Sequence, residues 1–319
     1  MHIIRLGGTL LLLLFLFLML SLAVLPAFSE TNQSVNIEQL KSDYYYISSL
    51  FPREEGSDNE KKAVSYIEDR LTEMNVEYQE HEFDTLQEGH SFSKNIIVDI
   101  SGSNDELLVL AVPINSIPET GFERDGSINI VLALSLIERY THTTPHRNLK
   151  IVFLGAEFGS KQMYPIGTGQ FLDDFYPAMN SAVLYLKFTG IPSKVNIHCG
   201  ANTVVAPYWL IDLCFESLRN VELPTRVRTR EIQILRLGGM DTVLPIKPYL
   251  ENEYPAVLVS GSGDEYAQRE ESMSVEAFLG KFSRFLPVFV ENTNEEYHEE
   301  WDRHYLFFQI GDTSLVIQE

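Results

Sequence analysis

The stretch LLVLAV at residues 107–112 decides the fold class, because an unbroken apolar run of this length suits a strand covered on both faces. Two further runs have the same character, LKIVFL at 149–154 and AVLYLKF at 182–188. Mostly apolar helical patterns follow two of the runs, at 128–140 and 208–218. Strands and helices that alternate in this way predict an α/β fold, a three-layer α/β/α sandwich around a mostly parallel or mixed central sheet.

The segments on either side extend the same pattern. Ser57 is expected to cap a helix that begins there, with Glu60 three residues on completing a capping box. The other expected elements are helices over 36–51, 168–175 and 275–290, an edge strand over 76–83, and strands over 94–100 and 256–259.

The C-terminal segment departs from this alternation. Residues 292–298 are polar and acidic, and 305–310 and 313–318 flank Gly311-Asp312, which predicts a β-hairpin on a tight turn. We therefore expect one domain over residues 30–290 and an appendage over 291–319 that comprises an acidic tail and the hairpin.

The N-terminal segment has the features of a secretory signal peptide. Arg5 precedes the apolar run 10–24, and Ala27-Phe28-Ser29 offers small residues before a cleavage point at Glu30. The run is also close to the length of a membrane span, so an uncleaved anchor is the alternative. We expect residues 1–29 to direct export to the periplasm or the extracellular space, with membrane attachment only if they are retained.

Composition excludes some partners. The 319 residues carry a net charge of −21, which repels phosphate backbones and anionic lipid, so nucleic-acid binding is not expected. Apolar residues make up 45% of the chain, enough for a globular core. The two cysteines, Cys199 and Cys214, are expected either to pair or to remain as two buried thiols.

Several short stretches together resemble the M28 family of zinc aminopeptidases over residues 36–290. They are PREEGSDNEKKAVSYIEDRLTEMNVEYQEHEF at 52–83, Asn95 with Gly102, FLGAE at 153–157, Gly167-Thr168-Gly169 with Phe171, Asp241 with Pro245, and Pro255-Ala256. The resemblance implies an aminopeptidase-like fold in which two zinc ions share five ligands: a His, a bridging Asp, a Glu, a second Asp and a final His. Such ions clamp the attacking water and the carbonyl oxygen.

At the positions that the resemblance assigns to zinc ligands, three residues cannot bind a metal and the fourth, a lysine, binds one poorly. Pro113 stands at the first His, Ile128 at the bridging Asp, Phe158 at the Glu and Lys187 at the second Asp. The final His has no counterpart, because residues 199–297 contain no histidine.

The remaining site residues follow from the same resemblance. Glu157 keeps the place of the general base, and we expect it to be vestigial. Asn115, Asn129 and Asp241 are expected to line the former pocket. No cofactor is expected.

These residues predict an exported pseudopeptidase that acts as a binding or scaffold protein for an unknown protein or peptide ligand. The alternatives are an active extracytoplasmic hydrolase that uses a non-standard or single-metal site, and a purely structural envelope protein. Inside the former site we expect Lys187 and Glu157, at the ends of neighbouring strands, to form an ion pair, directly or through one water, in place of the metals. The competing hypothesis is that Glu157 bonds to backbone amides while Lys187 reaches solvent.

Overall fold

The computed structural model describes residues 36–85, 92–116, 125–158, 165–175, 181–192, 194–228, 244–262, 273–292, 305–310 and 313–318, all of which belong to the unit Val35–Glu319. The predicted signal segment, residues 1–29, lies outside these ranges, as does Asp241. Within the described ranges no helix has the length and apolar character needed to cross a membrane.

An eight-stranded mixed sheet forms the centre of the fold, in the order β1-β2-β4-β3-β5-β10-β6-β9. The four inner strands β4, β3, β5 and β10 run parallel to one another, and β2 and β6 flank them in the antiparallel direction. The strands are β1 (Gln79–Asp84), β2 (Phe92–Ile100), β3 (Leu107–Pro113), β4 (Asn148–Leu154), β5 (Ser181–Lys187), β6 (Lys194–His198), β9 (Thr225–Val227) and β10 (Ala256–Ser262).

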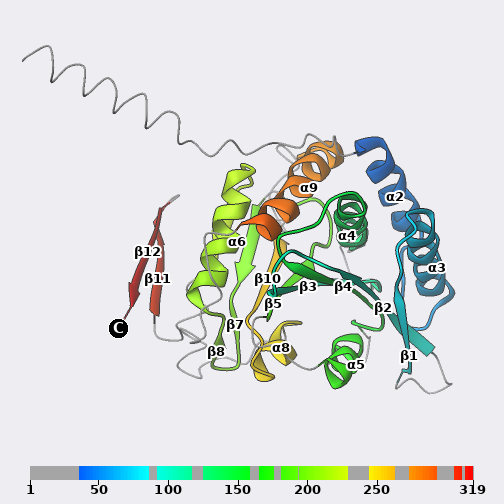
Figure 1. Cartoon of the computed structure of the whole chain (residues 1–319), viewed down its shortest axis with the longest axis horizontal. Coiled ribbons are helices and arrows are strands. Elements are labelled where there is room, and N and C mark those ends of the chain that lie inside the picture. The colour runs from blue at the N-terminus through cyan, green and yellow to red at the C-terminus, as the bar shows by residue number, and fades with distance from the viewer. Residues whose placement is uncertain are drawn as a thin grey trace, which may run out of the picture. The chain divides into compact units, whose positions relative to one another are not determined.

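Helices cover both faces of the sheet, but unequally (Figure 1). The larger core cluster joins one face to α2 (Ile37–Ser49), α3 (Asp58–Glu73), α4 (Ser127–Tyr140), α6 (Tyr208–Asn220) and α9 (Val275–Glu291). The smaller cluster joins the other face to two short helices, α5 (Ile166–Asp174) and α8 (Lys247–Glu251). The inner strands alternate between the two clusters: Leu184 and Leu186 belong to the first, and Val183 and Tyr185 to the second.

The predicted α/β fold is confirmed, and the differences lie in the short elements. The sequence patterns did not predict β6, β9, α8 or the small hairpin of β7 (Gly200–Ala201) and β8 (Val204–Val205). Each has at most five residues, too few for a hydrophobic period to be recognised. The predicted edge strand is present, but begins at Gln79 rather than at residue 76.

The C-terminal hairpin is also confirmed. Strands β11 (Tyr305–Ile310) and β12 (Thr313–Gln318) pair in the antiparallel direction, with Ile310 opposite Thr313. The two cysteines follow the second of the alternatives considered, because Cys199 and Cys214 are both buried and free.

A close contact between two loops generates a test of this packing. A Cβ atom added to Gly102 would lie 2.2 Å from the carbonyl carbon of Arg147, which is backbone and cannot move aside. We expect Gly102→Ala to lower the free energy of unfolding by roughly 1–3 kcal/mol. Gly190→Ala is the matched control, because a Cβ there has no atom within 4 Å. Urea unfolding of both variants checks the prediction, and equal stabilities would contradict it.

Candidate functional site at the carboxyl ends of the central strands

The loops that follow β3, β4 and β5 meet at one edge of the sheet, because these strands are parallel. The first turn of α4 lies at the same edge, since Asn129 bonds to the backbone just after β5. The former metal positions lie on these segments: Pro113 ends β3, Ile128 is in α4, Phe158 follows β4 and Lys187 ends β5.

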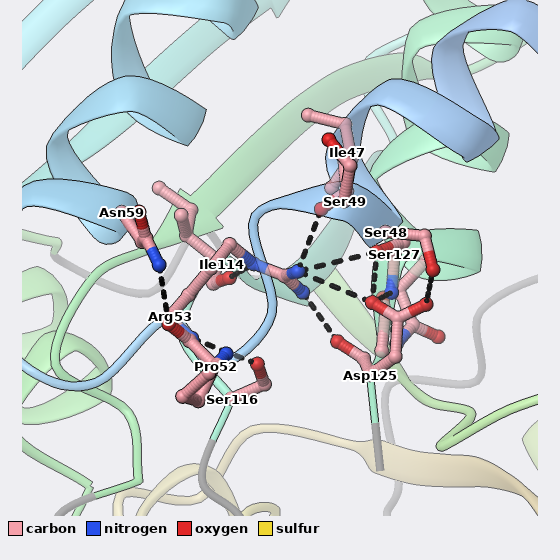
Figure 2. A network of polar contacts seen from close by, with 12 residues as sticks. Ile47, Ser48, Ser49, Pro52, Arg53, Asn59, Ile114, Ser116, Asp125 and Ser127 are labelled. Atoms are coloured by element: carbon pink, nitrogen blue, oxygen red, sulfur yellow. Dashed lines mark hydrogen bonds and ion pairs between the residues drawn. The ribbon is translucent and has the colours of Figure 1, made fainter. Parts of the chain in front are cut away.

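A fully buried arginine holds the segments around the first of these loops together (Figure 2). The guanidinium of Arg53 donates through Nε to the carbonyl oxygen of Ile114 at 2.9 Å and through Nη1 to that of Ile47 at 3.0 Å. It also donates to Asp125 Oδ1 at 3.1 Å, to Ser127 Oγ at 3.2 Å, and to the carbonyl oxygen of Asp125. One side chain thus joins the end of α2, the loop after β3 and the start of α4.

Asp125 balances the charge of this arginine and organises the helix start. Its carboxylate accepts from Ser48 Oγ at 2.6 Å and from the backbone N–H of Ser127 at 3.2 Å. Gly126 follows in the left-handed region at φ 68°, which favours glycine, and α4 begins at the next residue. Burial lowers the pKa of Arg53, while the charge of Asp125 and its hydrogen bond raise it. Asp125 is thus the carboxylate nearest to the buried guanidinium, with Nη1 and Oδ1 3.1 Å apart.

Two buried asparagines fasten the other loops. Asn115 Oδ1 accepts from the backbone N–H groups of Glu157 at 2.8 Å and Phe158 at 3.1 Å, and its Nδ2 donates to the Phe158 carbonyl at 2.6 Å. Asn129 accepts from the N–H of Phe188 at 2.9 Å and donates to its carbonyl at 2.8 Å. Asn115 and Asn129 are 3% and 1% exposed, so these backbone contacts lie in the interior of the protein.

Glu157 is buried and its carboxylate is occupied. Oε1 accepts from Thr168 Oγ1 at 2.7 Å and from the Tyr185 hydroxyl at 2.9 Å, and Oε2 accepts from the Thr168 N–H at 3.0 Å. Burial raises its pKa from 4.5 to about 7, although the hydrogen bonds from Thr168 and Tyr185 and the charge of Lys187 act against the rise. With 3% exposure the carboxyl does not present itself to a substrate.

The expected placement of Glu157 and Lys187 on neighbouring strands is wrong, and an ion pair between them stays a prediction. The carboxylate of Glu157 bonds to neutral donors on α5 and β5, and the charge of Lys187 lowers its pKa. The ammonium of Lys187 lies over the ring of Phe158, 4.7 Å from its centroid. Glu157 follows β4 and Lys187 ends β5, and β3 lies between these two strands. The competing hypothesis is borne out for Glu157 in part, because one of its three hydrogen bonds comes from a backbone amide, that of Thr168.

The side chains present at the metal positions do not fit zinc. Pro113 and Ile128 are buried and Phe158 is half-buried, and none of the three has a donor atom for a cation. The ammonium of Lys187 would repel a divalent ion. Among the residues that the structure describes, no three His, Cys, Asp or Glu side chains gather closely enough to hold a metal ion.

Sequence reasoning missed the residues that organise this region. In the sequence-based predictions, Arg53 appears only as part of the stretch 52–83. An arginine between two predicted helices of an acidic chain could have indicated a buried ion pair. Glu60 was predicted as a helix cap, and the N–H of Glu60 does bond to Ser57 Oγ at 3.1 Å. Its buried carboxylate, however, accepts from the N–H groups of Gly56 at 2.6 Å and Ala156 at 2.9 Å, so it anchors the loop after β4 as well.

Solved structures share this fold. A glutaminyl cyclase from Fimbriiglobus ruber superposes with a TM-score of 0.63 at 12% identity, covering 81% of this chain and 95% of its own. A zinc aminopeptidase from Bacillus subtilis superposes with a TM-score of 0.60 at 9% identity, covering 80% of this chain and 95% of its own. A putative zinc-dependent exopeptidase from Bacteroides vulgatus superposes with a TM-score of 0.58 at 10% identity, covering 82% of this chain and 97% of its own. The fold is thus that of zinc-dependent exopeptidases, aminopeptidases and glutaminyl cyclases.

The chain belongs to the TP_0564 family: the pattern of that family's first domain (TP_0564_1st) matches residues 156–317. An uncharacterized protein of Treponema pallidum (strain Nichols) is 24% identical over 189 residues, which is 58% of this chain. The match spans 25% of the length of that relative.

The buried arginine yields a stability prediction. Arg53→Lys keeps the charge but cannot reproduce the guanidinium fork, so backbone acceptors and Asp125 lose their donors inside the core. We expect a loss of about 3–5 kcal/mol in the free energy of unfolding. Arg219→Lys, at a side chain that is 57% exposed, is the control and should change stability little. Chemical denaturation measures both, and a tolerated Arg53→Lys would show that the network is dispensable.

The raised pKa of Glu157 yields a pH prediction. Between pH 4.5 and about 7 the folded state keeps a proton that the unfolded state has lost, so this group's contribution to stability falls as pH rises. The loss should reach about 3 kcal/mol near pH 7 and then level off. Glu157→Gln removes the titration. Between pH 4.5 and pH 7.5 the free energy of unfolding of the wild-type protein should therefore fall by this amount relative to that of Glu157→Gln. Parallel pH profiles of the two proteins would contradict the prediction.

Proposed function

We propose that this protein is an exported, catalytically inactive relative of the M28 aminopeptidases that works as a binding or scaffold protein. The observation that carries the proposal is the chemistry of Pro113, Ile128, Phe158 and Lys187, which stand where the resemblance places four zinc ligands. Three of them offer no donor atom and the fourth is a cation.

The surroundings of Glu157 support the same proposal. General base catalysis needs a carboxylate within hydrogen-bond reach of a substrate's water. Here both oxygens of Glu157 accept bonds from Thr168 and Tyr185 in the interior of the protein. A buried base of this kind contributes to the fold rather than to turnover.

Export and the ligand belong to the proposal as well. The features of residues 1–29 support secretion to the periplasm or the extracellular space, with an anchor as the alternative outcome. The ligand would be a protein or peptide, held at the former substrate groove or at the C-terminal hairpin. Mass spectrometry of the extracytoplasmic fraction should find a mature N-terminus near Glu30, and a full-length membrane-bound chain would support the anchor.

The test of inactivity uses protein purified without chelator. Elemental analysis should find far less than one zinc ion per chain, and aminoacyl-anilide and short peptide substrates should remain intact. Stoichiometric zinc, or hydrolysis that Glu157→Gln abolishes, would support the rival function, an active hydrolase with a non-standard or single-metal site. Hydrolysis that persists in Glu157→Gln and keeps a constant specific activity through further purification would also support that rival, whereas activity that separates from the protein on further purification belongs to a contaminating peptidase.

A further inference from the structure

A hollow of about 360 Å³ lies between α2 and α3, which are drawn side by side in blue in Figure 1. The hollow is lined by helices and not by the loops that follow the central strands. A role for it is therefore independent of the proposed function. The lining residues are Tyr46, Asp58, Lys61, Lys62, Ser65, Tyr66 and Asp69.

One wall of the hollow is a rigid pair of aromatic rings. Tyr46 and Tyr66 stack with their centroids 4.4 Å apart and their planes at 26°. The Tyr66 hydroxyl donates to Asp43 Oδ1 at 2.6 Å, and that buried carboxylate also accepts from Gln39 Nε2 at 2.6 Å and pairs with Arg70. The hydrogen bond to Asp43 therefore fixes the ring of Tyr66, and the ring of Tyr46 stacks on it. Tyr46 remains 44% exposed, so part of its ring faces solvent.

The rest of the lining is polar and comes from one face of α3. Asp58, Lys61, Lys62, Ser65 and Asp69 recur at helical spacing and are all exposed. Among the described residues, no ion pair within 4 Å uses any of these four charges, which leaves them directed at the hollow and at solvent. Two carboxylates and two ammonium groups sum to no net charge.

We propose that this hollow binds a neutral saccharide. A sugar ring presents C–H groups on its face, which suit the apolar face of Tyr46, and hydroxyls at its edge, which both donate and accept. A mixed rim of carboxylate, ammonium and hydroxyl groups satisfies such hydroxyls. An apolar peptide side chain would instead desolvate the rim without replacing its hydrogen bonds. Because the rim carries no net charge, it favours a neutral ligand over an acidic or basic one.

The test titrates the full-length protein with cellobiose, maltose and N,N′-diacetylchitobiose by saturation-transfer NMR and calorimetry. At least one disaccharide should bind, with roughly millimolar affinity. Tyr46→Ala should weaken that binding by about tenfold or more, whereas Tyr46→Phe, which keeps the ring, should preserve it. Tyr45→Ala is the matched control, because Tyr45 is 58% exposed on the same helix but does not line the hollow. Thermal unfolding establishes that all variants are folded.

Three results would overturn the proposal. The first is that none of the three disaccharides binds the wild-type protein. The second is that binding is unchanged in Tyr46→Ala, which would place the sugar elsewhere. The third is that a proline-rich peptide binds at Tyr46 while no disaccharide does, which would make the hollow a peptide site.

Discussion

The site region depends on one buried charge, the guanidinium of Arg53. It is inaccessible to solvent, and its five hydrogen bonds tie α2, the loop after β3 and the first turn of α4 to a single point. Burying an unpaired arginine would cost several kcal/mol, so the loop that carries Asp125 must take the position that pairs it. Gly126 then turns the chain in the left-handed region, and α4 starts where it packs against the sheet. The geometry of the strand ends follows from this pairing.

The same edge of the sheet shows what can hold loops together when metal ligands are absent. In a zinc site, several loops converge because each gives a ligand to one ion. Here Asn115 holds the turn after β4, Asn129 holds the end of β5, and Glu60 holds Ala156, each through backbone groups. Three of the four positions that the resemblance assigns to ligands carry apolar side chains, and one of these, Ile128, belongs to the main core cluster. The scaffold keeps its shape through side-chain–backbone bonds, which is a requirement for a binding protein as much as for an enzyme.

Long, strongly patterned elements could be predicted from the sequence, and the polar interior could not. Runs such as 107–112 indicate buried parallel strands by their composition alone, because a strand that is covered on both faces has apolar side chains at every position. Strand order is different: β3 lies between β4 and β5, and no local pattern states this, so the expected Lys187–Glu157 pair assumed the wrong neighbours. The partners of Glu157 also come from distant segments, Thr168 and Tyr185, and their hydroxyls have no sequence signature. The absence of zinc ligands at the positions that the resemblance assigns is, by contrast, a prediction from residue chemistry and needs no coordinates.

The central claim is that the aminopeptidase-like fold of this protein is complete without a metal ion. The most direct measurement is the thermal unfolding midpoint in the presence of a strong chelator and of increasing Zn²⁺. A specific site that is present only in the folded state would stabilise it by about 2.7 kcal/mol at a zinc concentration one hundred times the dissociation constant. The account predicts the same midpoint with chelator as with micromolar zinc. A midpoint that rises with zinc and saturates at one or two ions per chain would contradict it.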